Sequence, residues 1–254
     1  MRITAVLNGY KRGAHLASQL SAINGQTIPP VTIMLWQNQG EAFDPALSAQ
    51  TVHAGCNVNL GVWARFAYAL NANTEYICVF DDDTIPGRRW FENCLNTLSV
   101  HDGLLGTVGV RYHTTSSYFP FSRVGWVAPN ESTEQVDIVG HAWFFRRDWL
   151  SCFWRELPGY NQSRLVGEDM HFSYTLQKYL GLNTYVPPHP KGQLDLWGSM
   201  PQTGMSIGQD AAAISMNPAN MHLMSHVYVD YIRRGFRIMA KSRMDAAPLK
   251  VSVG

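Results

Sequence analysis

Short apolar runs alternate with segments of helical periodicity along the first half of the chain. Residues 3–7 and Tyr76–Phe80 are uninterrupted apolar runs, as is typical of strands buried on both faces. The same pattern predicts strands at residues 31–36, near residues 51–52 and at residues 106–110. Three helices are predicted between them, with inward residues Leu16, Leu20 and Ile23; Val62, Trp63, Phe66, Ala67 and Leu70; and Trp90, Phe91, Cys94, Leu95 and Leu98. Strands that alternate with helices predict an α/β fold with a mainly parallel sheet.

The second half of the chain is less regular. Residues 114–134 are rich in Ser, Pro and aromatic residues, which predicts a loop that shapes a cleft. Residues 136–145 are apolar and predict a strand. Glu168–Leu180 has helical periodicity and is followed by Gly181, a residue that commonly ends helices. A further strand is predicted at residues 184–186.

Composition excludes several classes of protein. The 254 residues include 20 basic and 19 acidic side chains, and a net charge of +1 argues against nucleic-acid binding by general electrostatics. No apolar run approaches the roughly 18 residues that a membrane span needs, and the N-terminus does not resemble a signal peptide. The four cysteines are scattered, which favours free thiols over a disulfide framework or a zinc site. These features predict a cytoplasmic protein without a transmembrane segment.

Polar and acidic residues follow three of the predicted strands. Asn8, Gln37 and the triplet Asp81-Asp82-Asp83 each come directly after an apolar run. Because ligands of such sheets bind beyond the carboxyl ends of the strands, these residues are predicted to share one site. Adjacent carboxylates repel one another, and Mg²⁺ or Mn²⁺ removes that cost. Since alternate side chains of a strand point the same way, Asp81 and Asp83 are predicted to face one pocket while Asp82 turns aside. A solvated acidic turn is the alternative.

The residues around the triplet resemble a known family. Residues 80–86 (FDDDTIP) resemble the DXD motif of GT-A fold glycosyltransferases, and the whole chain resembles the family 2 type. Other segments match that family in the expected order: residues 6–12 (VLNGYKR), 25–27 (GQT), 59–65 (NLGVWAR), 136–147 (VDIVGHAWFFRR) and 167–169 (GED). The resemblance covers residues 2–190 and implies an α/β, Rossmann-like GT-A fold with a mostly parallel central sheet flanked by helices.

The resemblance also implies a reaction and a set of roles. A sugar moves from a nucleotide-diphosphate sugar to a hydroxyl group of a glycan or other acceptor, with inversion, and Asp169 is the catalytic base. Mn²⁺ or Mg²⁺ is held by Asp81 and Asp83, with His189 as a further ligand. The implied donor contacts are Asn8, Tyr10, Arg12, Gln37, Arg65, Asp81 and Asp82. The implied acceptor-side residues are His141, Trp143 and Glu168.

One position departs from the family pattern. Family members usually carry Asp after the second strand, where it reads the nucleotide base, and this chain has Gln37 followed by Asn38. An amide both donates and accepts hydrogen bonds, so it can still read a uracil or thymine edge. A UDP-sugar is the favoured donor, and GDP-sugars and dTDP-sugars remain open.

Other interpretations also stay open. Acidic residues at a helix start complement the helix dipole, which is the alternative role of Glu168 and Asp169. His189 is as compatible with a structural role as with a metal site, and His222 is a weaker ligand candidate. A sugar-nucleotide nucleotidyltransferase is the second enzymatic hypothesis. An inactive relative that binds nucleotide sugars or carbohydrate is the non-enzymatic one.

Residues 1–195 are predicted to form the catalytic domain, and residues 196–254 a C-terminal extension packed on it. Trp197, Gly198, Gly204 and Gly208 predict a mobile loop that closes over the donor. Residues 224–244 predict an amphipathic helix whose basic side chains are Arg233, Arg234, Arg237 and Lys241. A solvated helix face is the favoured interpretation, and contact with the diphosphate or with an anionic membrane surface is the alternative.

Overall fold

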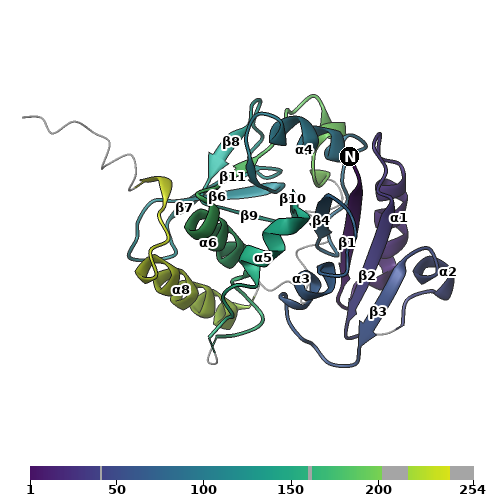
Figure 1. The fold of residues 1–254 in the computed structure, drawn as a ribbon, viewed down its shortest axis with the longest axis horizontal. Helices are drawn as coiled ribbons and strands as arrows, with labels where there is room; N and C mark the ends of the chain where they lie inside the picture. Colours follow the sequence, from purple (N-terminus) through teal and green to yellow (C-terminus); the bar gives the residue numbers. More distant parts are fainter. Residues whose placement is uncertain (41, 160–161, 202–216, 241–254) are drawn as a thin grey trace, which may run out of the picture.

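A large sheet runs through the middle of the molecule (Figure 1). The computed structural model describes residues 1–40, 42–159, 162–201 and 217–240. In this part of the chain eight strands form the sheet in the order β3-β2-β1-β4-β10-β5-β11-β8. They are β1 (Ile3–Gly9), β2 (Thr32–Asn38), β3 (Val52–Cys56), β4 (Tyr76–Phe80), β5 (Gly103–Leu105), β8 (Glu134–Val136), β10 (Ala142–Arg146) and β11 (Asn183–Val186). Only β8 and β10 run against the other six, which confirms the predicted, mostly parallel α/β sheet.

Helices flank this sheet and fill its core with aromatic side chains. They are α1 (Leu16–Asn24), α2 (Pro45–Ser48), α3 (Ala64–Ala69), α4 (Trp90–Leu98), α5 (Leu150–Phe153), α6 (Glu168–Leu180) and α8 (Pro218–Arg233), with short 3-10 turns at Gly13–His15, Arg147–Trp149 and Leu194–Leu196. Phe66 of α3 stacks on Phe153 of α5 at 4.8 Å, and Phe172 of α6 meets Phe145 of β10 at 4.8 Å. These contacts bind three helices to one face of the sheet.

The prediction of the inner face of α3 is partly wrong. Trp63 and Phe66 are buried, but Ala67 is exposed and Leu70 is 48% exposed. α3 is only six residues long, so few of its side chains pack against the core, and Leu70 already lies beyond its end.

The second half of the chain contains a small antiparallel sheet of β6 (Val108–Tyr112), β7 (Phe121–Gly125) and β9 (Ile138–Gly140). The predicted loop at residues 114–134 therefore contains a strand. The single strand predicted at residues 136–145 is instead divided among β8, β9 and β10. The predicted strand is interrupted at two residues. At Asp137 the carboxylate accepts hydrogen bonds from the Tyr112 and Met239 amides at 2.7 Å each, and at His141 the backbone φ angle is +71°. Local apolar pattern does not encode these tertiary bonds.

The C-terminal helix starts and ends earlier than predicted. The side chain of Asn217 caps α8 by accepting from the Ala219 amide, and Gly235, with φ of +103°, follows its end. Arg237 is beyond the helix and Lys241 lies outside the described residues, so the predicted basic stripe does not form on α8. Figure 1 shows α8 beside α6.

The predicted mobile loop is only partly described. Trp197 and Gly198 are buried beside β6, where the Trp197 indole donates to the Pro190 carbonyl oxygen at 2.9 Å. Gly204 and Gly208 lie outside the described residues, and the domain boundary at residue 195 stays a prediction. Among the described helices, none combines the length and apolarity that crossing a membrane would require.

Candidate functional site

A cavity of about 440 Å³ lies at the edge where β1, β2 and β4 end. Parallel pairing of Leu7 with Phe80 places Asn8, the next residue of β1, beside the acidic triplet. Asn38 at the end of β2 lines the same cavity. The remaining walls come from residues 59–65, from residues 140–143 and 165–169, and from the first turns of α8. The structure thus brings the predicted strand-end residues to one edge, where all of them except Gln37 line the cavity.

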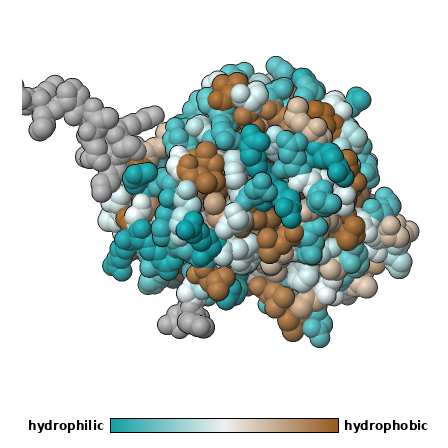
Figure 2. Space-filling model, in the orientation of Figure 1, coloured by the Kyte–Doolittle hydropathy of each residue, from teal (hydrophilic) through white to brown (hydrophobic). Residues whose placement is uncertain are grey.

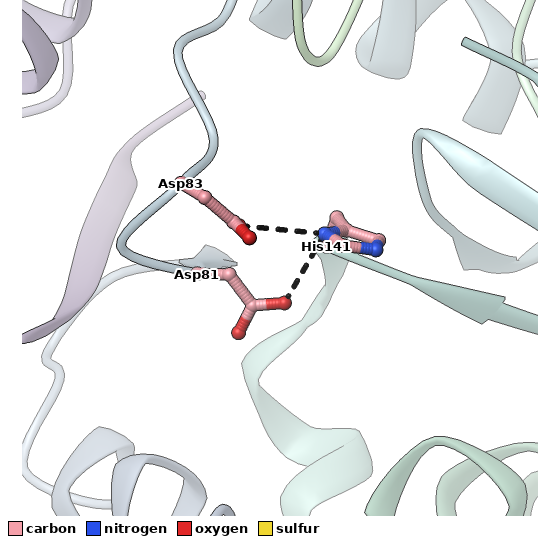
Figure 3. Close-up of side chains that lie close together, drawn as sticks. All are labelled: Asp81, Asp83 and His141. Carbon is pink, nitrogen blue, oxygen red and sulfur yellow. Dashed lines mark ion pairs between the residues drawn. The ribbon is translucent and has the colours of Figure 1, made fainter. Parts of the chain in front are cut away.

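Asp81 and Asp83 point toward His141 (Figure 3). One carboxylate oxygen of each lies 3.5 Å from Nδ1 of His141, and one ligand atom from each of the three residues fits within a span of 4.8 Å. The sheet explains this arrangement. β10 pairs antiparallel with β4 so that Ala142 faces Phe80, and the Asp81 amide donates to the His141 carbonyl oxygen at 3.0 Å. His141 is therefore held opposite the triplet by main-chain bonds.

These three side chains fit a divalent cation. Nδ1 of His141 is buried and makes no hydrogen bond within the described residues, although two carboxylates lie close to it. A buried nitrogen that makes no hydrogen bond is costly, and a cation shared with the two carboxylates would satisfy it. Two carboxylate oxygens and one imidazole nitrogen are hard to borderline donors that suit a divalent metal such as Mn²⁺. His141 was predicted from sequence for the acceptor side.

The electrostatics of the three residues agree with a cation site. Burial opposes protonation of His141, but Asp83 and Asp81 raise its pKa above the usual value. Burial also opposes ionisation of Asp83, while His141 and Arg12 hold the pKa of that carboxyl below its usual value. The carboxylates of Asp81 and Asp83 thus favour a positive charge at the position of the His141 ring.

Asp82 is not part of the group of Asp81, Asp83 and His141 and forms a separate contact. Its carboxylate accepts from the Tyr10 amide at 3.0 Å and from Arg12 at 2.7 Å. Burial raises the pKa of Asp82 to about 6, and Arg12 opposes that shift. Asp82 still lines the cavity and ties the loop after β1, which carries Tyr10, Lys11 and Arg12, to the triplet.

Arg65 lies beneath the site and joins its two sides. Its guanidinium contacts the Asp81 carboxylate and lies 2.6 Å from the Glu168 carboxylate. It also lies 4.5 Å from the ring centroid of Trp143, which lines the cavity from β10. Burial opposes its charge, yet Asp81 and Glu168 raise the pKa of Arg65 above its ordinary value. Burial raises the pKa of Glu168, and Arg65 opposes that shift.

Asp169 lies in the first turn of α6 and lines the same cavity. Gly167 precedes the helix with φ of +92°, a conformation that L-residues with side chains rarely adopt. Burial raises the pKa of Asp169 to about 6, although its side chain accepts from the Met170 amide at 2.7 Å. A carboxylate with a raised pKa in a cavity is suited to accept a proton near neutral pH.

Two predicted residues are placed outside this group. His189 is fully buried, and its ring nitrogens hydrogen-bond the Thr107 hydroxyl at 2.8 Å and the Pro187 carbonyl oxygen at 2.7 Å. It is neither among the cavity-lining residues nor in the group of Asp81, Asp83 and His141, and both of its ring nitrogens have protein partners. Gln37 contacts the His53 side chain at 3.2 Å and is not among the cavity-lining residues. His222 is exposed on α8.

Several cavity-lining residues were not assigned from the sequence. Asn38 was noted only as the neighbour of Gln37, and its amide donates to Asn59 at 2.9 Å and to the Gly61 carbonyl oxygen at 3.2 Å. The matched segment at residues 59–65 was the signal that could have identified Asn59. Asn217, Asn220 and Met224 line the cavity from α8, and no sequence signal linked that helix to the triplet.

Comparison with known proteins defines the fold. No family model and no curated protein matches the chain. The structure of S. aureus TarS 1–349 in complex with UDP is similar, with a TM-score of 0.51 and 15% identity over 74% of this chain and 58% of that chain. A second S. aureus TarS structure has a TM-score of 0.51 and 12% identity over 99% of this chain and 46% of that one. This chain therefore spans about half the length of the TarS structures. The likeness shows the fold: the chain has the expected GT-A fold, with a large, mostly parallel sheet flanked by helices.

Proposed function

We propose that this protein is a metal-dependent, inverting glycosyltransferase that uses a nucleotide-diphosphate sugar. One observation carries the proposal: a single cavity contains both the cation-binding set Asp81, Asp83 and His141 and the carboxylate of Asp169. The GT-A fold supports it, since such sheets bind nucleotides at this edge. The complex of TarS with UDP makes a UDP-sugar the favoured donor.

The donor is proposed to lie along the ends of β1 and β2. Asn8 presents a buried side-chain oxygen that has no hydrogen-bond partner within the described residues. Lys11 is exposed at the cavity, and Arg12 lies against Asp82 and Asp83, so both bring positive charge to a diphosphate. Asn38 is the proposed nucleoside contact in place of Gln37, because it lines the cavity. A divalent cation bound at the triplet would stabilise the negative charge of the leaving diphosphate.

Asp169 is proposed as the base. Its carboxylate takes the proton from the acceptor hydroxyl while that oxygen forms a bond to the anomeric carbon. The bond from that carbon to the diphosphate oxygen breaks, and its electron pair stays with the nucleoside diphosphate. Because attack and departure are on opposite faces of the sugar ring, a single displacement inverts the anomeric configuration. Arg65 holds Asp81 and Glu168 at fixed positions on either side of this path.

Nucleotide binding tests the proposal. We expect Mn²⁺ to tighten the binding of UDP or another nucleoside diphosphate in calorimetry by about tenfold or more, or about 1.4 kcal/mol. Asp83→Asn should remove this enhancement because it removes a charged ligand. Asp148→Asn is the matched control, since its carboxyl is 94% exposed and outside the cavity. Binding that ignores both Mn²⁺ and Asp83→Asn contradicts the proposal.

The product of donor turnover separates this function from the nucleotidyltransferase alternative. A glycosyltransferase incubated with its donor alone slowly releases a nucleoside diphosphate and free sugar, because water replaces the acceptor. A nucleotidyltransferase breaks or forms the bond between the two phosphates and therefore exchanges pyrophosphate. Release of nucleoside diphosphate without pyrophosphate exchange is the expected result.

A further inference from the structure

One face of α8 is directed at the residues around Asp169. Asn217, Asn220, Met224 and Val227 recur at spacings of three, four and three residues, so they share one side of the helix. The first three line the cavity. Val227 packs closely against Gly167: a Cβ atom added to Gly167 would lie only 2.8 Å from Cγ1 of Val227. The same helix face therefore reaches from the residue before Glu168-Asp169 into the cavity.

This helix is firmly attached to the rest of the protein. Tyr231, one turn beyond Val227, shares a 2.7 Å hydrogen bond with His171 of α6. The Tyr228 hydroxyl donates to the Thr114 carbonyl oxygen. Both tyrosine side chains are buried in a cluster with Tyr112 and Tyr174. The second half of α8 thus anchors the helix, and its first half lines the cavity.

The chemistry of this wall is neutral. Asn217 and Asn220 contribute amides, and Met224 contributes a flexible apolar side chain. Of the described residues lining the cavity at 140–143, 165–169 and α8, none is Lys or Arg. Arg65 below them is already paired with Asp81 and Glu168. Lys11 and Arg12 line the cavity beside β1, where the donor diphosphate is proposed to lie. On the Asp169 side, the described lining residues give an anionic acceptor no lysine or arginine to offset repulsion from the carboxylates.

We propose that the first half of α8 forms the acceptor subsite and that the acceptor is an uncharged, hydroxyl-bearing molecule such as a neutral sugar. Amides donate to and accept from hydroxyl groups, and methionine adapts to the apolar face of a sugar ring. Asn220, which is only 9% exposed, and Met224 are the specificity-determining residues. This inference rests on the proposed function and names its substrate class.

The outward side of α8 differs from this inner face. Figure 2 shows mainly hydrophilic side chains over α8 on the face of the molecule in view. His222 and His226 are exposed side chains of α8.

The test uses simple acceptors with matched charge differences. The donor is the nucleotide sugar that the protein hydrolyses fastest without acceptor, and the probes are methyl glucoside, methyl galactoside and methyl N-acetylglucosaminide, each against its uronate or 6-phosphate counterpart. Neutral probes should be favoured by about tenfold or more in kcat/KM. Equal use of charged probes, a preference for them, or no transfer to neutral probes by protein that hydrolyses the donor overturns the inference. Absence of both donor hydrolysis and nucleotide binding overturns the proposed function instead.

Two variants localise the effect. Asn220→Ala should raise the KM for neutral acceptors by about fivefold to tenfold, the loss of one or two hydrogen bonds, with a smaller change in the donor KM. Met224→Lys should shift the preference toward the anionic probes, because it supplies the missing cation. His226→Ala, on the outer side of the same helix, is the matched control. Urea unfolding shows whether Asn220→Ala and Met224→Lys fold with the midpoint of the native protein. If both fold so and match His226→Ala in acceptor KM and in charge preference, α8 does not form the acceptor subsite.

Discussion

The region around His141 and the region around His189 each combine a histidine with tryptophan, but they differ in charge. The ring centroids of His141 and Trp126 lie 4.8 Å apart, and Nδ1 of His141 lies 3.5 Å from an oxygen of each of two carboxylates. His189 lies 5.7 Å from Trp90 and 5.5 Å from Trp197, and its ring nitrogens bond a hydroxyl and a main-chain carbonyl oxygen. Nδ1 of His141 makes ion pairs but no hydrogen bond within the described residues, whereas both ring nitrogens of His189 hydrogen-bond neutral groups.

This difference decides what each histidine can do. Burial lowers the pKa of His189 to about 4, so the ring stays neutral and holds its neighbours together. Burial acts against His141 as well, but the carboxylates raise its pKa. A metal ion at His189 would have to break existing hydrogen bonds, whereas a cation at His141 would replace none. The partners of a histidine, more than its burial, separate a ligand from a structural residue.

The largest expected effect is at Asp169, which shares the cavity with His141. Asp169→Asn should reduce sugar transfer by about 10³-fold, because loss of a general base typically costs 10²–10⁴. Nucleotide affinity should remain, since the donor contacts are elsewhere. Initial rates of nucleoside-diphosphate release and calorimetry measure the two effects. Unimpaired transfer would remove Asp169 as the base.

His141→Ala tests the metal side of the comparison directly. We expect Mn²⁺ to bind about 100-fold more weakly, a loss of about 2.7 kcal/mol, because one ligand is removed. Mn²⁺ affinity can be measured by electron paramagnetic resonance in the presence of nucleotide. Unchanged affinity would mean that His141 is no ligand, and the contrast with His189 would then lose its basis.

His189→Ala should act on stability instead. Removing a fully buried ring leaves a cavity and an unpaired Thr107 hydroxyl, with an expected loss of about 2–3 kcal/mol of unfolding free energy. Urea unfolding measures this loss, and His226→Ala on the surface should change it by less than about 0.5 kcal/mol. The folded His189→Ala protein should bind Mn²⁺ and nucleotide as the native protein does. Loss of Mn²⁺ binding in folded variant protein would reverse the two roles.

The smallest expected effect is the pH dependence of transfer. Burial raises the pKa of Asp169 to about 6, and the base must be ionised, so the rate should rise with pH through about 6 and then level off. At pH 5 we expect about tenfold slower transfer than at pH 7, because Asp169 is ionised in only about one protein molecule in ten at pH 5 and in most molecules at pH 7. His189, with a pKa of about 4, stays neutral over this interval and adds no step. A rate that does not change between pH 5 and 7 argues against Asp169 as the titrating base.

Local pattern predicted the N-terminal half of the fold well. β1, β4 and α1 follow apolar runs that are buried as predicted, and the triplet follows β4 directly. The inner face of α3 was predicted only in part, because Ala67 and Leu70 are exposed. The second half was predicted less well. The apolar segment at residues 136–145 reads as one strand, but β10 inserts between β4 and β5 and the two strands before it pair elsewhere. Strand exchange of this kind depends on partners far away in the sequence.

The candidate site shows the same division. Asn8 and Asp81 were brought together by parallel pairing, which strand order makes predictable. The choice between Gln37 and Asn38 was not, because adjacent residues of a strand point to opposite sides and only the packing of β2 shows which side is the cavity. The contribution of α8 was also hidden, since nothing local links residues 217–224 with Asp169.

The sequence by itself determined the alternation of strands and helices, the acidic triplet at a strand end and the carboxylates at the start of α6. These features are local, because periodicity, helix stops and adjacent charges act over a few residues. Only the tertiary structure decided that His141 and not His189 joins the triplet and that α8 closes the cavity. Those outcomes depend on which polar atoms are already satisfied and which charges lie nearby. Both are set by residues far apart in the sequence, such as Arg65 with Glu168 and Thr114 with Tyr228.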